Sequence, residues 1–322
     1  MAPVVAVPLF VASLAVTLLA ARFFAQRLDT IGTRFGLPEA MIGLLTAVAA
    51  DGPEISSAMV ALIKGAHSTS VGVLVGSNAF NLAAMIGVSA LLTGCVAVAR
   101  RDLAPEGALC IAITVIAAAV LLRWLPAVVG VALALAAVVP YALWLRNAER
   151  EALAEHSSPS VSETESESAP EATRATHHLL GLIVVDVALI VGGSFGMVEA
   201  ALSLGSRWGV SEALLGVLIL GPLTSIPNAA TAIRLGLAGR STALVGEAFN
   251  SNAINLGVGA IIPALFVSVT HPSGTAKLEV AWVVAMTLTA VAMLARKRGV
   301  RRPEAAALVI MYAGFVAVAA LG

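Results

Sequence analysis

The chain has 322 residues, of which 59% are hydrophobic and only 12% are charged; its mean hydropathy is +0.96 and its formal net charge is zero. A soluble domain of this size could not bury so much apolar surface, so the composition excludes an ordinary soluble enzyme or a nucleic-acid-binding protein. Apolar runs recur along the whole length, most of them near the roughly 20 residues that cross about 30 Å of hydrocarbon. The sequence therefore predicts an all-α membrane protein with the lipid bilayer as its main partner.

The apolar runs predict ten transmembrane helices in chain order. The first runs into Arg22 without a small-residue cleavage pattern, so we expect a mature helix and not a signal peptide. Cys95 and Cys110 have no metal or redox spacing and are expected to be packing residues. The predicted spans are residues 4–25, 40–63, 70–92, 104–122, 126–145, 179–202, 212–235, 242–269, 278–295 and 305–320.

The basic residues predict the orientation of these spans. With ten spans, 15 of the 19 Lys and Arg residues fall in loops on one side, and the other side holds Lys64, Arg123, Arg207 and Lys277. Because cytoplasmic loops accumulate Lys and Arg, we expect a plasma (inner) membrane protein with both termini outside.

One segment, residues 146–178, differs in composition from the rest of the chain. It is rich in glutamate, serine, proline and alanine, a composition that cannot bury enough apolar area to offset the entropy of ordering it. We expect a disordered acidic cytoplasmic linker between a first half, residues 1–145, and a second half, residues 179–322. A regulatory cation-binding role for this linker remains an alternative.

The two halves repeat each other. Arg34–Gly43 aligns with Arg207–Gly216, and the match continues through residues 40–92 and 212–265. Each half has five predicted spans, an odd number, so equivalent helices must cross the membrane in opposite directions. Two inverted five-helix repeats are typical of an alternating-access transporter whose site lies at the midplane between the repeats.

Polar residues lie within the repeated spans. Pro53 and Pro227 fall mid-span, where each removes a backbone donor and frees a carbonyl. Asp51 and Glu54 are three residues apart, hence on one helical face, and each would cost about 2.5–3.5 kcal/mol at the bilayer centre. A bound cation would offset much of this cost.

The next helix of each repeat carries amide and hydroxyl side chains on one face. A site of carboxylates, amides, hydroxyls and carbonyls suits hard cations such as Ca²⁺, Na⁺ or Mg²⁺ and disfavours zinc or copper. For any single serine or asparagine, a role in packing helices together is an equal alternative. The polar residues of these helices are Ser77, Asn78, Asn81, Ser251, Asn252 and Asn255.

These two segments resemble the α-repeats of the sodium/calcium exchanger and cation antiporter superfamily, whose pattern is Gly-Thr-Ser-Leu-Pro-Glu on one helix and Gly-Ser-Asn-x-x-Asn/Asp on the next. The resemblance implies that Glu54 is the central bridging carboxylate, with Ser77 and Asn81 beside it. It also implies that oxygens at Thr224, Ser225 and Ser251 contact the ions. The resemblance implies no cofactor beyond the transported cations.

The sequence departs from the superfamily pattern at several of these positions. Asn228 stands in place of the second-repeat glutamate and Asn255 in place of a frequent aspartate. Asp51 replaces a serine, Ala50 a threonine and Glu247 an asparagine. Asp51 or Glu247 would restore the missing negative charge. Proton coupling gains weight, because closely spaced carboxylates repel one another and favour proton uptake when no cation is bound.

We therefore predict a secondary antiporter that exchanges Ca²⁺, or another hard divalent cation, for Na⁺ or H⁺, and not an enzyme. The alternatives are a cation channel or ion-sensing protein on the same scaffold, or a transport-inactive relic. The inverted repeats favour the antiporter, because a channel does not need a site exposed alternately to each side. No oligomeric state is predicted. The predicted cation-site residues are Asp51, Glu54, Ser77, Asn78, Asn81, Thr224, Ser225, Asn228, Glu247, Ser251, Asn252 and Asn255.

Charged residues elsewhere in the spans have simpler expectations. Asp186 lies inside the sixth span and is either a proton-relay group or a partner in an ion pair near the cytoplasmic side. Glu106, Arg123, Glu199 and Glu279 lie near span ends, where we expect them to reach the interface as anchors.

Overall fold

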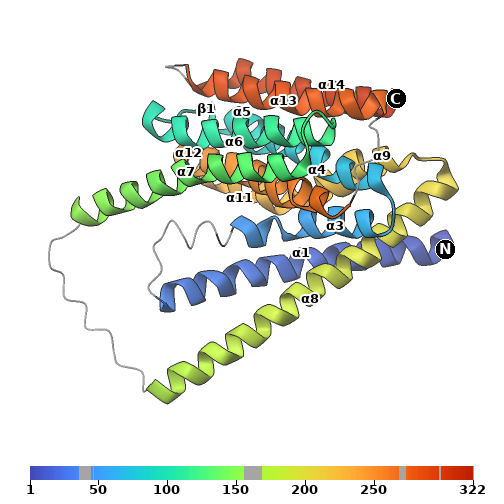
Figure 1. Cartoon of the computed structure of the whole chain (residues 1–322), viewed down its shortest axis with the longest axis horizontal. Helices are drawn as coiled ribbons and strands as arrows, with labels where there is room; N and C mark the ends of the chain where they lie inside the picture. Colours follow the sequence, from blue (N-terminus) through green and yellow to red (C-terminus); the bar gives the residue numbers. More distant parts are fainter. Residues whose placement is uncertain (36–44, 46, 156–168, 268–272, 297–298, 322) are drawn as a thin grey trace.

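The computed structural model describes residues 1–35, 45, 47–155, 169–267, 273–296 and 299–321, and these form a bundle of helices (Figure 1). The elements of the first half are α1 (Pro3–Arg34), α3 (Gly52–Ile63), α4 (His67–Asn81), the π-helix η1 (Leu82–Val88), α5 (Ser89–Thr93), β1 (Cys95–Val96), α6 (Arg100–Leu121) and α7 (Ala127–Glu155). Those of the second half are α8 (Ala169–Trp208), α9 (Glu212–Leu214), η2 (Leu215–Leu220), α10 (Gly221–Thr224), α11 (Ile226–Leu237), α12 (Ser241–Leu256), η3 (Gly257–Ile261), η4 (Pro263–Leu265), α13 (Gly274–Leu294), β2 (Val300–Arg301) and α14 (Arg302–Leu321).

The predicted helical membrane class is confirmed. Within the described ranges, eight helices are long and apolar enough to cross a membrane, or nine if the bent pair Glu212–Thr224 and Ile226–Leu237 is one span. Each overlaps a span expected from hydropathy. The second predicted span, residues 40–63, includes residues 40–44 and 46, which lie outside the described residues, and α3 is its later part.

The span His67–Thr93 forms the centre of the bundle. It is the most buried of the candidate spans, with 83% of its apolar window buried against 28% for α1. Helices α3, α12, α13 and α14 pack against it, α6 packs against α12 and α13, and α7 lies outside α6 (Figure 1). The polar face of α4 is therefore enclosed by protein.

Helices α1 and α8 form a long antiparallel pair along one side of this bundle (Figure 1). Small residues bring their backbones together: a Cβ added to Gly193 would lie 2.9 Å from the Ser13 carbonyl oxygen. Arg27 forms an ion pair with Asp186 and also donates to the Leu182 carbonyl oxygen at 3.4 Å. Of the two expectations for Asp186, the structure supports the ion pair.

Glycine residues allow the backbone of α4 to contact the backbone of η2 and α10 in the second half. A Cβ added to Gly76 would lie 2.7 Å from Val217 Cα, and one added to Gly221 would lie 2.8 Å from the Ser77 backbone nitrogen. No side chain separates the two segments, so backbone atoms of α4 lie directly against backbone atoms of η2 and α10. This crossing holds the polar residues of α4 beside the break between α10 and α11.

Two features outside the spans were not expected. Cys95 pairs with Arg301 and Val96 with Val300 in a short antiparallel ladder, which joins the end of α5 to the start of α14. Helix also extends to Glu155 on α7 and begins at Ala169 on α8, inside the predicted linker segment 146–178. Residues 156–168 of the predicted linker lie outside the described residues.

Candidate cation site

Both repeats place a helix break at equivalent positions. Asp51 precedes α3 with φ −82° and ψ −1°, and Ser225 separates α10 from α11 with φ −85° and ψ −3°. Pro53 and Pro227 follow in the first turn of α3 and α11, where their missing N–H groups are tolerated. The bend at Ser225 measures 45°. Each break points the first turn of a helix, with its polar side chain, toward the centre of the bundle.

The Asp51 carboxylate lies at the contact between the two repeats. Asn228 Nδ2 donates to Asp51 Oδ1 at 2.7 Å, and Ser251 Oγ donates to the same oxygen at 2.6 Å. The Asp51 side chain is completely buried. Both donors come from the second half, so Asp51 depends on the partner repeat for its hydrogen bonds.

Glu54 lies one helical turn further along α3 and is also completely buried. Ser225 Oγ donates to Glu54 Oε1 at 2.9 Å, and Asn228 Nδ2 lies 3.5 Å from the same oxygen. The Asn228 amide therefore lies between the two carboxylates. This position is where the superfamily pattern has a second glutamate.

The amides of α4 and α12 continue the polar cluster. Asn81 Nδ2 donates to Ser251 Oγ at 3.1 Å and to Asn252 Oδ1 at 3.2 Å. Asn252 Nδ2 donates to the Asn78 carbonyl oxygen at 3.2 Å. Hydrogen bonds thus connect α3, α4, α11 and α12 around the two carboxylates.

Several buried oxygens of these helices have no hydrogen-bond partner among the described residues. An unpartnered buried oxygen is costly in an apolar interior, and a carboxylate oxygen is the most costly. Oxygen is also the ligand atom of hard cations. The atoms are Asp51 Oδ2, Glu54 Oε2, Asn78 Oδ1, Asn81 Oδ1 and Asn255 Oδ1.

Four of the predicted residues are not part of this hydrogen-bond network: Ser77, Thr224, Glu247 and Asn255, whose two polar side-chain atoms have no partner among the described residues. Ser77 Oγ donates to the Leu74 carbonyl oxygen at 3.1 Å, and Thr224 Oγ1 donates to the Leu220 carbonyl oxygen at 2.8 Å, so both hydroxyls bond their own helix. Glu247 lies one turn before Ser251 on α12 and is only partly buried.

Comparison with known proteins decides the family. The profile of the family described as "Sodium/calcium exchanger protein" matches residues 5–147 and 178–321, which is most of both halves. The chain belongs to this exchanger family. "Putative antiporter CaxA" of Alkalimonas amylolytica is 26% identical over 301 residues, covering 91% of each chain.

Solved structures share the fold of this exchanger-family protein. An H⁺/Ca²⁺ exchanger CAX superposes with a TM-score of 0.72 at 17% identity, covering 98% of this chain and 85% of the other. The sodium-calcium exchanger NCX_Mj superposes with a TM-score of 0.60 at 17% identity, covering 98% and 99%. At this identity the similarity establishes the fold alone.

Two acidic residues of the exchanger-family protein are buried, although the sequence predicted that they reach the membrane interface. Glu106 is 8% exposed and Glu279 is 2% exposed, each with a buried carboxylate oxygen that has no hydrogen-bond partner in the described part of the chain. The expectation that they anchor the interface was wrong, because neighbouring helices cover them. Neither residue lies in a repeated motif, so nothing in the sequence indicated that its side chain is buried.

A serine contact beside the candidate site was also missed. Ser57, one turn after Glu54, donates to Ser194 on α8 at 3.3 Å, and Ser56 hydrogen-bonds the same hydroxyl. The only sequence signal is the spacing of three residues from Glu54, which places Ser57 on the same helical face. This contact joins the α1–α8 pair to the helix that carries both carboxylates.

Proposed function

We propose that this protein is a secondary active antiporter that exchanges Ca²⁺, or another hard divalent cation, for Na⁺ or H⁺ by alternating access. The observation that carries the proposal is the buried pair Asp51 and Glu54, each with an unpartnered carboxylate oxygen, enclosed by amides and hydroxyls from both halves. Two carboxylates without a cationic partner are expensive to bury, and a bound cation removes that cost.

The ligand chemistry supports a hard cation. Within the described residues no three His, Cys, Asp or Glu side chains are grouped to hold a metal ion. An ion beside Asp51 and Glu54 would therefore be held by two carboxylates and otherwise by neutral oxygens, a set suited to Ca²⁺ and Na⁺ and unsuited to zinc or copper. The names of related proteins, an H⁺/Ca²⁺ exchanger and a sodium-calcium exchanger, agree with this choice of ions.

The charge of the site supports a stoichiometry. Asp51 and Glu54 together carry two negative charges when ionised, and one divalent cation, two Na⁺ or two protons would each neutralise them. We therefore propose an electroneutral exchange of one divalent cation for two monovalent ions. Glu247, one turn before Ser251 on α12, would contribute a third charge when ionised.

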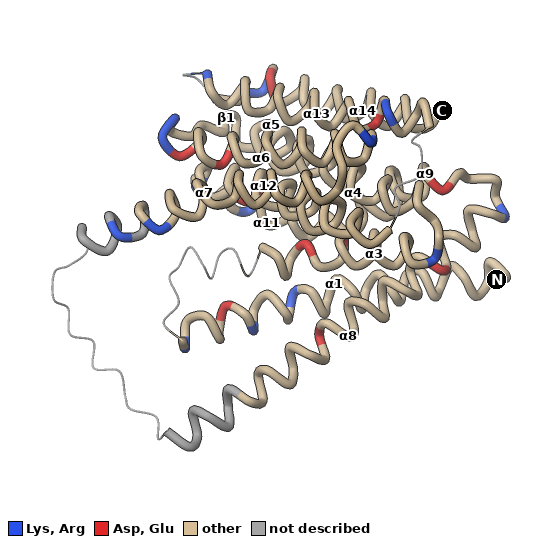
Figure 2. Tube along the Cα trace, in the orientation of Figure 1, with Lys and Arg blue, Asp and Glu red and all other residues tan. Residues whose placement is uncertain are grey.

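Alternating access is supported by the inverted repeat. The matching backbone angles at Asp51 and Ser225, each followed by a proline two residues later, are the features expected if two five-helix halves cross the membrane in opposite directions. We propose ten spans with both termini outside. Figure 2 shows most Lys and Arg residues at the end of the molecule where α6 begins and α7 ends, which supports assigning that end to the cytoplasm.

Flux in proteoliposomes tests the function. We expect uptake of Ca²⁺ that is driven by an opposing Na⁺ or proton gradient and is unchanged when the membrane potential is clamped at different values with a potassium ionophore. The variant Glu54→Gln is the matched control, because it keeps the shape of the side chain and removes its charge. Uptake that follows the membrane potential without any counter-ion gradient would indicate a channel and contradict the proposal.

A further inference from the structure

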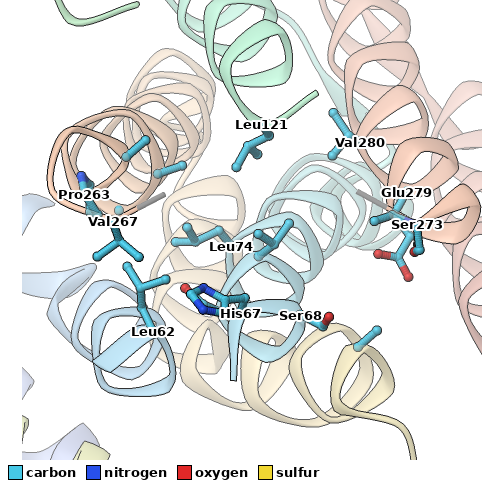
Figure 3. A pocket seen from close by; sticks show the side chains of 17 residues that line it. Leu62, His67, Ser68, Leu74, Leu121, Pro263, Val267, Ser273, Glu279 and Val280 are labelled. Carbon is cyan, nitrogen blue, oxygen red and sulfur yellow. Dashed lines mark hydrogen bonds between the residues drawn. The ribbon is translucent and has the colours of Figure 1, made fainter. Parts of the chain in front are cut away.

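A partly open cavity lies outside the candidate cation site. It has a volume of about 170 Å³ and is lined by the starts of α4 and α13, the end of α3, and the η3–η4 segment. Figure 3 shows Leu74 near its centre, His67 and Ser68 along one side, and Glu279 beside Ser273 on another. The cavity lies at the end of α4 that is opposite to the basic end of the molecule.

Glu279 is the acidic residue that lines this cavity. Its side chain is 2% exposed and its Oε1 atom is buried without a hydrogen-bond partner, and no ion pair among the described residues includes it. An unpaired carboxylate is costly in such a place. A cation in the cavity would offset the cost.

The rest of the lining indicates which cation fits. Ser68, Ser70 and Ser273 add hydroxyl oxygen atoms and His67 adds an imidazole, and the other walls are mainly apolar. At roughly 30 Å³ per water molecule, the cavity holds about five waters. An inorganic cation could therefore keep most of its hydration shell while its charge faces Glu279.

The cavity ends one helical turn from Ser77, one of the predicted cation-site residues on α4. Leu74 lines its inner side and packs closely on η3, since a Cβ added to Gly259 would lie 2.6 Å from Leu74 Cδ2. Ser77 Oγ bonds the Leu74 carbonyl oxygen, and three residues of helix rise about 4.5 Å. Leu74 therefore lies between the inner side of the cavity and Ser77 on α4.

We propose that this cavity is an accessory binding site for a hydrated inorganic cation, in which Glu279 concentrates the ion before it passes Leu74 to the central carboxylates. The proposal rests on the proposed antiport, because it assigns the cavity to the path of the same ion. The binding site itself has a test that does not need transport.

Charge-selective modification tests the site directly. In a background with Cys95→Ala and Cys110→Ala, Ser68→Cys places a thiol on the cavity wall. We expect a cationic methanethiosulfonate reagent to react about ten-fold faster than an anionic reagent of similar size, since a carboxylate in a low-dielectric cavity attracts cations. Added Ca²⁺ or Na⁺ should slow the cationic reagent.

Variants test whether the preference for the cationic reagent comes from Glu279 or from the overall charge of this end of the protein. Glu279→Gln should abolish the preference and Glu279→Asp should retain it, which also guards against a loss that comes from misfolding. Glu199→Gln is the matched control, because Glu199 pairs with Lys64 at the same end of the molecule and does not line the cavity. Equal rates for the two reagents in the parent, or a preference that Glu279→Gln leaves unchanged, would overturn the proposal.

Flux adds a second readout. When the cation is offered from the cavity side, Glu279→Gln should raise KM several-fold and leave the maximal rate unchanged, and it should have no effect from the opposite side. A symmetric loss of maximal rate would contradict an accessory site. If the parent shows no coupled flux, the antiport proposal fails while the modification experiment still decides whether the cavity binds cations.

Discussion

The contact between Asp51 and Asn228 predicts that a carboxylate at position 228 can replace the carboxylate at position 51. Asn228 Nδ2 lies 2.7 Å from Asp51 Oδ1, so a carboxylate at either position would occupy nearly the same space. We expect Asp51→Ser to weaken binding of a divalent cation, and Asn228→Glu added to that variant to recover much of the loss. Asn228→Glu alone should not improve binding, because it would place a third carboxylate beside Asp51 and Glu54.

The magnitude follows from the charges. A carboxylate and a divalent cation 4 Å apart interact by about 8 kcal/mol at an effective dielectric constant of 20, and desolvation offsets more than half of this. We expect Asp51→Ser to cost about 3 kcal/mol, or roughly 100-fold in Kd. The double variant should recover at least about 1.5 kcal/mol, well above the 0.3–0.5 kcal/mol within which independent sites add.

The assay is calorimetric titration of Ca²⁺ into the purified protein and its three variants, with thermal unfolding of each as a check on folding. The reasoning is refuted if the two substitutions add within about 0.5 kcal/mol. In that case Asp51 does not supply the charge that Asn228 lacks, and Glu247 becomes the better candidate for it.

Three further predictions concern transport, packing and topology. Glu54→Gln should abolish cation-driven flux while the protein stays folded, and flux at the parent rate would remove Glu54 from the site. Gly221→Ala should lower the free energy of unfolding by about 1–3 kcal/mol, because its methyl group meets the backbone of α4. Gly192→Ala is the control: nothing lies within 4 Å of its added methyl group, so the free energy of unfolding should stay nearly unchanged. A thermal melt in detergent measures both variants. In a cysteine-free background, Ala238→Cys should react only with reagents that enter the cytoplasm and Ser206→Cys with impermeant external reagents; the reverse pattern would invert the proposed orientation.

The sequence predicted well what depends on periodicity and register. Apolar run lengths located the spans because the bilayer fixes how long an apolar helix must be. The repeated motifs identified Asp51, Glu54, Asn228 and Ser251, which hydrogen bonds now bring together. The position of a motif within a span was therefore sufficient to predict that these four side chains lie together.

Side-chain partners and burial away from the motifs could not be predicted in this way. Whether Glu279 reaches the interface or faces a cavity depends on which helices pack around α13, and hydropathy does not specify those neighbours. The same holds for Ser194, which meets Ser57 only because α8 lies against α3. The ladder between β1 and β2 joins residues about 200 positions apart, beyond any local signal.

The glycine crossing of α4 with η2 and α10 restricts how ions can reach the centre. Because backbone meets backbone at Gly76 and Gly221, no side chain at that crossing can rotate aside to open a gap. In the proposed antiport, access from either membrane surface would therefore open along the flanks of these two segments and not between them. The cavity beside Leu74 lies on one such flank, so entry to the centre would depend on how α3 and α13 shift relative to α4, η2 and α10.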